Sequence, residues 1–141
     1  IEVKYKTRWI HATIMGEEYS LKNQGAQDQC RYDYVKDISR IENCPESHYG
    51  FAVFLTNDDL YWKQSAHGLE SVDSAFRIHD GCRINGRLAW KDGTSSGTMS
   101  GRVKPIEITG AYDLRWADYS DVENINGKFR YLLVKIGQSD E

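Results

Sequence analysis

The segment Tyr49–Leu55, Tyr-Gly-Phe-Ala-Val-Phe-Leu, is the feature that most limits how this chain can fold. A nearly continuous apolar run of this length is typical of a strand that is buried on both faces of a sheet. A second strand is predicted at Lys128–Ile136, which is also rich in large apolar residues. Strands of this kind occur where helices cover the sheet.

A helix is predicted from about Ala26 to Glu42, ahead of both of these strands in the chain. Apolar residues recur there at spacings of three and four, which places them on one face of a helix. The members of this stripe are Ala26, Cys30, Tyr34, Ile38 and Ile41. A helix flanked by buried strands predicts an α/β (α+β) fold with a central mixed β-sheet flanked by helices.

The remaining elements are predicted from turn residues and short apolar runs. A glycine- and serine-rich stretch is predicted to be a mobile loop near 91–104. The other predictions are a short helix around Leu60–Trp62, a hairpin of Ala75–His79 with Arg83–Trp90, and a strand at Ile106–Thr109.

Length and charge place the chain in a broad class. With 141 residues it is long enough for a single domain, 1–141, with its own core. Its net charge of −3 argues against a generally basic surface for non-specific nucleic-acid binding. A local basic groove beside acidic metal ligands is still compatible with that charge. We expect no membrane partner, because no apolar stretch reaches the roughly 18 residues of a membrane span.

Three cysteines, Cys30, Cys44 and Cys82, are widely spaced and form no Cys-x-x-Cys pair. A zinc site built on cysteine is therefore not expected. Free buried thiols in a reducing compartment are the simpler interpretation, and we expect the protein to be cytoplasmic.

The first residues, Ile1–Arg8, alternate apolar and polar side chains and predict a strand. Glu2, Lys4 and Lys6 should share one face of it, opposite Val3 and Tyr5. Because the chain begins within this strand and without Met, we expect an N-terminal portion of the protein to lie elsewhere.

Glu2-Val3-Lys4 is the candidate for chemistry. A carboxylate and an ammonium on one face of a strand suit phosphodiester hydrolysis, in which Glu2 binds a divalent cation and Lys4 assists the attacking water. The carbonyl of Val3 can add a further oxygen ligand. The simpler alternative is an ordinary solvated strand face, because so short a motif often arises by chance.

Beyond that triplet, the sequence resembles the PD-(D/E)XK nuclease superfamily, and in particular uncharacterised bacterial restriction-type proteins. The resemblance covers most of the chain. It is carried by Glu2–Thr7, Ser20–Asp28, Arg31–Asp37, Phe51–Asp58 and Trp116–Ser120.

This resemblance implies a restriction-endonuclease-like fold and a DNA endonuclease that depends on Mg²⁺ or Mn²⁺. It implies that Glu2 is a metal ligand and Lys4 the catalytic lysine. The family's other metal-binding Asp lies on the preceding strand, and nothing precedes Ile1 here. We therefore expect the N-terminal part of the core to be missing and the chain alone to be catalytically incomplete.

Two helix residues, Gln27 and Arg31, border the predicted buried face near the helix start. Some relatives place a polar residue there so that it faces the site, and an Arg could hold the scissile phosphate with two hydrogen bonds. The equally weighted alternative is a buried polar pair bonded to its neighbours. Asp33 and Asp37 are expected on a solvated face or in pairs with Lys36 and Arg40.

The main rival function is a non-catalytic nucleic-acid- or protein-binding module with the same fold. A structural partner subunit is a third possibility. The expected partners are DNA, the missing N-terminal segment or a second subunit, and a second copy of the chain in a homodimer.

Overall fold

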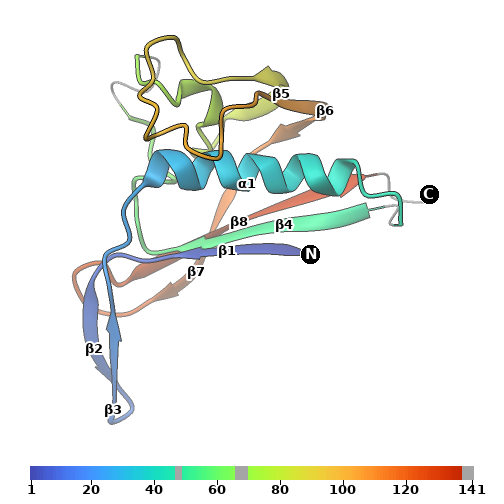
Figure 1. Cartoon of the computed structure of the whole chain (residues 1–141). Helices are drawn as coiled ribbons and strands as arrows, with labels where there is room; N and C mark the ends of the chain where they lie inside the picture. Colours follow the sequence, from blue (N-terminus) through green and yellow to red (C-terminus); the bar gives the residue numbers. More distant parts are fainter. Residues whose placement is uncertain (47–48, 66–69, 138–141) are drawn as a thin grey trace.

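The computed structural model describes residues 1–46, 49–65 and 70–137 (Figure 1). Its elements, in chain order, are β1 (Glu2–Lys6), β2 (Ile10–Ile14), β3 (Glu17–Leu21), α1 (Gln27–Glu42), β4 (Tyr49–Thr56), the short 3₁₀ helix η1 (Ser74–Phe76), β5 (Arg83–Leu88), β6 (Ile106–Asp113), β7 (Trp116–Asp121) and β8 (Lys128–Gly137).

A mixed four-stranded sheet forms the centre, in the order β1-β4-β8-β7. The parallel pair is β1 and β4, while β8 runs antiparallel to both β4 and β7. Parallel neighbours need a crossover connection, and α1 lies within the one between β1 and β4. The predicted α+β class with a central mixed sheet is confirmed. The predicted flanking helices are not, because α1 is the one α-helix among the described residues and it covers one face of the sheet.

Helix α1 is buried on more than one side. In Figure 1 it lies between the central sheet and the β5–β6 hairpin. Tyr34 and Ile38 are completely buried and Tyr32 nearly so. The hydroxyl of Tyr34 donates a 2.9 Å hydrogen bond to the carbonyl of Ala52 in β4, which satisfies a polar group inside the core.

The end of α1 approaches β4 closely at Gly50. A Cβ atom at that position would lie 2.6 Å from Cγ2 of Ile41. This contact explains why a glycine interrupts the apolar run of β4, since any larger residue would push the helix away from the sheet.

Opposite α1, the sheet presents an exposed apolar face. Val3 and Tyr5 of β1, Tyr119 of β7 and Leu133 of β8 are all exposed there. The other face of β1 carries Glu2, Lys4 and Lys6. This face is turned towards the helix and is less exposed. The predicted alternation of β1 is confirmed, and the charged face of the strand is the one that lies towards α1.

The predicted strands and helix are confirmed at β1, α1, β4 and β8. The expected burial of β4 on both faces is wrong, because Ala52 and Phe54 are buried while Val53 and Leu55 on the opposite face are half-buried. The predicted strand at Ile106–Thr109 is also confirmed and continues to Asp113 as β6. Ala26 is exposed and precedes α1, whereas Cys30, Tyr34 and Ile38 of the predicted stripe are buried.

The predicted hairpin of Ala75–His79 with Arg83–Trp90 is wrong. Residues 74–76 form η1, and β5 pairs with β6 instead. Asp80 and Gly81 bond to distant chain segments: the Asp80 amide donates to Trp62 O and the Gly81 amide to Leu114 O. Long-range pairing therefore replaces the local turn that Asp-Gly suggests.

The predicted short helix around Leu60–Trp62 is a turn. Residues 91–104 form turns without a strand or helix, and this segment is bonded to α1 by a double contact between Arg102 and Asp33, at 2.7 and 2.8 Å. The mobility of this loop stays a prediction.

The cysteines are free, but only Cys30 is buried, since Cys82 is half-buried and Cys44 exposed.

None of the helices in the described part of the chain combines the length and the apolar character needed to cross a membrane.

Candidate functional site

Four charged side chains meet where β1 faces α1, and we name them the β1–α1 charge cluster: Glu2, Lys4, Asp37 and Arg40. The ammonium of Lys4 lies 3.1 Å from Oδ2 of Asp37. Arg40 lies 3.4 Å from Oδ1 of Asp37 and 4.0 Å from Oε1 of Glu2. Strand β1 and helix α1 run in opposite directions. Lys4 therefore pairs with Asp37, and Glu2, which is earlier in the strand, pairs with Arg40 in the next turn of the helix.

The side chains of the cluster differ in the fraction that is exposed to solvent. The side chain of Asp37 is 1% exposed, that of Lys4 27% and that of Glu2 43%. Neither carboxylate oxygen of Asp37 has a well-aligned hydrogen-bond partner, although cations lie beside both. The cluster therefore combines a buried acid, Asp37, with a more accessible acid, Glu2.

Burial raises the pKa of the Asp37 carboxyl above the ordinary aspartate value. The adjacent Lys4 opposes this shift, and the negative charge of Glu2 adds to it. Burial has the largest effect, because removing a carboxylate from water disfavours its charged form. Asp37 consequently holds a proton at a higher pH than an exposed aspartate does.

The prediction for Glu2 and Lys4 on one face is confirmed by their shared contacts with α1. The expectation of a solvated face for Asp37 is wrong, although its predicted pairing with Arg40 is present. Sequence reasoning overlooked Asp37 as a site residue. The sequence signal that could have identified Asp37 is its position three residues after Tyr34 and seven after Cys30, on the buried stripe of the helix.

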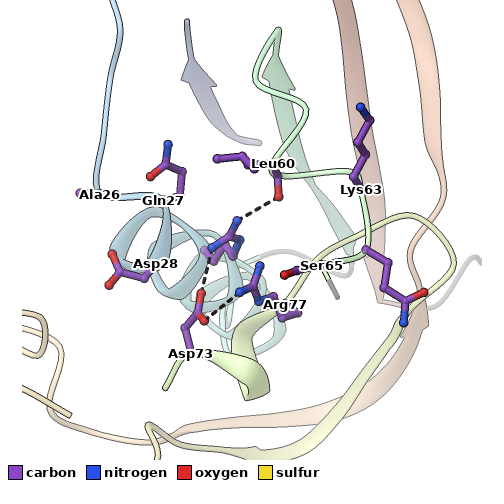
Figure 2. A pocket seen from close by; sticks show the side chains of 10 residues that line it. Ala26, Gln27, Asp28, Leu60, Lys63, Ser65, Asp73 and Arg77 are labelled. Carbon is purple, nitrogen blue, oxygen red and sulfur yellow. Dashed lines mark hydrogen bonds and ion pairs between the residues drawn. The ribbon is translucent and has the colours of Figure 1, made fainter. Parts of the chain in front are cut away.

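Gln27 and Arg31 lie at the other end of α1. Arg31 precedes Asp37 by nearly two turns, or about 9 Å at the rise of an α-helix. Both line a pocket at the start of α1 (Figure 2). The structure thus brings Glu2 and Lys4 together, and Gln27 and Arg31 together, in two separate places.

The contacts of Gln27 are with Asp58, a buried residue in the turn after β4. The amide of Gln27 donates to Oδ2 of Asp58 at 3.1 Å, and Arg8 donates to Oδ1 at 3.0 Å. Oδ1 also accepts from the Leu60 amide at 3.0 Å. Asp58 therefore joins the start of α1, the segment after β1 and the end of β4.

The possible metal ligands of the cluster are the carboxylates of Glu2 and Asp37. Among the residues that the structure describes, no group of three or more His, Cys, Asp or Glu is placed to hold a metal ion. A cation at the cluster would therefore take its remaining ligands from water, from substrate or from backbone carbonyls. Mg²⁺ commonly binds proteins in this way, through one or two carboxylates.

No protein-family model, no curated protein and no solved structure matches this chain. Its function is therefore inferred from the chemistry of its own side chains.

The ion pair between Lys4 and Asp37 should couple the stability of β1 to that of α1. In a double-mutant cycle of Lys4→Met and Asp37→Asn, we expect a coupling free energy of about 1–3 kcal/mol from urea unfolding. Pairing Lys4→Met with Asp33→Asn is the control, because Asp33 contacts Arg102 instead, and should give coupling within about 0.5 kcal/mol. Equal coupling in both cycles would contradict the assignment.

The raised pKa of Asp37 predicts a pH dependence of known sign. As pH rises from about 4, the unfolded chain releases this proton first while the folded chain still holds it. The unfolding free energy of the wild type, relative to Asp37→Asn, should therefore fall and then level off once folded Asp37 is ionised. Urea unfolding of both proteins from pH 4 to 8 measures it, and a relative rise would show that Lys4 outweighs burial.

Proposed function

We propose that this protein is a DNA endonuclease of the PD-(D/E)XK type that depends on Mg²⁺ or Mn²⁺ and acts in the cytoplasm. Its site is the β1–α1 charge cluster. The observation that carries the proposal is that Glu2 and Lys4 share one face of β1 and that Lys4 lies beside the buried carboxylate of Asp37. The mixed sheet, with its parallel pair bridged by a helix, agrees with a restriction-endonuclease-like fold.

The residues present fit a hard divalent cation. Carboxylate oxygens are the ligands that Mg²⁺ prefers, and the oxygens of Asp37 have no well-aligned hydrogen-bond partner. Glu2 is accessible to solvent and to a large substrate. The carbonyl of Val3 is a further oxygen of the same strand. Bound Mg²⁺ would lower the pKa of its water and neutralise charge on the phosphate.

The position of Lys4 supports a catalytic role for its ammonium. The carboxylate of Asp37 lies 3.1 Å from the Lys4 ammonium and restrains its direction, while part of the Lys4 side chain stays exposed. A lysine so placed can donate a hydrogen bond to the attacking water and offset charge that develops on the phosphate. Asp37 acts on Lys4 as a positioning residue in addition to offering a carboxylate.

Arg40 extends the cluster towards solvent. Its side chain is largely exposed and lies near both acids, so it can turn outwards to a DNA phosphate when one arrives. This local positive charge suits binding to DNA despite the acidic balance of the whole chain.

The rival, a non-catalytic nucleic-acid- or protein-binding module with the same fold, is favoured by one observation. The described residues offer two carboxylates at the cluster and no group of three metal-ligating side chains. A module of this kind would bind DNA or a protein without cleaving DNA, and would be indifferent to Mg²⁺ beyond general salt effects.

Cleavage of duplex DNA by the full-length protein in Mg²⁺, compared with the same reaction in EDTA, separates these functions. We expect Glu2→Gln and Lys4→Met each to lower the cleavage rate by about 100-fold or more, because each removes a group that acts on developing charge. Lys6→Met is the matched control, since Lys6 shares this face of β1 but makes no contact with the cluster acids, and should keep the wild-type rate.

DNA binding measured in Ca²⁺ accompanies these assays, so that a folding defect is distinguished from a loss of chemistry. The proposal fails if the full-length protein binds DNA but cleaves none in Mg²⁺ or Mn²⁺. It also fails if cleavage is unchanged in both Glu2→Gln and Lys4→Met.

A further inference from the structure

A second charged site lies at the other end of α1, in an open hollow of about 620 Å³. It is formed by the start of the helix, the turn after β4 and the segment that leads through η1 (Figure 2). Arg31 of α1 and Arg77, which follows η1, approach each other there. Lys63 lies at the exposed rim.

One carboxylate serves both arginines. Asp73 lies 2.9 Å from Arg31 and 3.4 Å from Arg77. The side chains of Arg31 and Asp73 are 6% and 4% exposed, and that of Arg77 is 18% exposed. Two guanidinium groups beside one carboxylate leave an excess positive charge in a largely dehydrated place. Such a charge is costly unless a further anion compensates it.

Both arginines also have unused donors. Arg31 donates from one terminal nitrogen to Asp73 and from the other to the carbonyl of Leu60, each at 2.9 Å. Its Nε is buried and has no hydrogen-bond partner, and the same is true of Nε of Arg77. Buried N–H groups without an acceptor are rare in proteins, and an ordered water or an ion is among the acceptors that can satisfy them.

The surroundings favour an anion. Burial, and then the charge of Arg31, lower the pKa of Arg77, which reflects the cost of this uncompensated charge. Helix α1 begins at the pocket, and its N-cap residue, Ala26, provides no side-chain cap, so the positive end of the helix dipole is directed there. The one other acid of the lining, Asp28, accepts from the Gln29 amide and points away from Asp73 (Figure 2).

We propose that this pocket binds a phosphate group through Arg31 and Arg77. A tetrahedral oxyanion offers several acceptors to diverging N–H donors, and guanidinium groups bind it by charge-assisted hydrogen bonds. The phosphate can be a free or nucleotide monoester or a diester of a nucleic-acid backbone. This site is separate from the β1–α1 charge cluster and does not depend on the proposed cleavage activity.

The test is an NMR titration of the ¹⁵N-labelled chain in EDTA, following the arginine Nε–H signals. The probes are inorganic phosphate, thymidine 5′-monophosphate and a short DNA duplex, with chloride at equal ionic strength as the reference. We expect the Nε–H signals of Arg31 and Arg77 to shift on saturation. Arg77→Gln should weaken the binding at least 10-fold, while Arg83→Gln, which removes a surface arginine paired with Asp113, should leave it unchanged.

The three probes identify the source of the phosphate. Binding of phosphate and the nucleotide, without the duplex, supports a small-molecule ligand. Saturable binding of the duplex that Arg77→Gln weakens supports a nucleic-acid backbone. The proposal is overturned if none of the probes shifts these signals beyond the chloride reference, or if Arg77→Gln and Arg83→Gln weaken binding equally. Because no divalent cation is present, this result is independent of any failure to cleave DNA.

Discussion

The ion pair between Lys4 and Asp37 is the interaction on which the rest of the structure depends. A carboxylate that is 1% exposed needs a cation beside it, and the strand supplies that cation only if its charged face turns towards the helix. The orientation of β1 therefore follows from one buried acid on α1. The same orientation places Glu2 on the face of Lys4, as the more exposed acid of the cluster, and turns Val3 and Tyr5 outwards.

Helix α1 carries both charged regions of the molecule. Its later turns provide Asp37 and Arg40 to the β1–α1 charge cluster, and its first turns provide Gln27 and Arg31 to the pocket. Core residues between them hold the helix rigidly between the sheet and the β5–β6 hairpin, so the spacing of the two regions is fixed by the helix itself. A phosphate chain lying along α1 would meet a positive group at each end.

Local patterns were sufficient to predict α1, β4 and β8, because the helix has apolar residues at spacings of three and four and both strands are runs of large apolar residues. They also placed Glu2 and Lys4 on one face, since alternation in a strand is a local property. The pairing of β5 with β6 and the burial of Asp37 were missed, because both depend on partners far away in the chain. The β2–β3 hairpin was missed as well, although Met15-Gly16, both at positive φ, is a two-residue turn between alternating runs.

The central claim is that Glu2, Lys4 and Asp37 form a place where a divalent cation and a phosphate can meet. Paramagnetic broadening of the amide NMR spectrum by Mn²⁺ tests it most directly. We predict selective broadening of the amides of Glu2, Lys4, Asp37 and their neighbours at low Mn²⁺ concentration, with those around Asp73 and Arg77 unaffected. Broadening that is absent, or centred elsewhere in the molecule, would contradict this account.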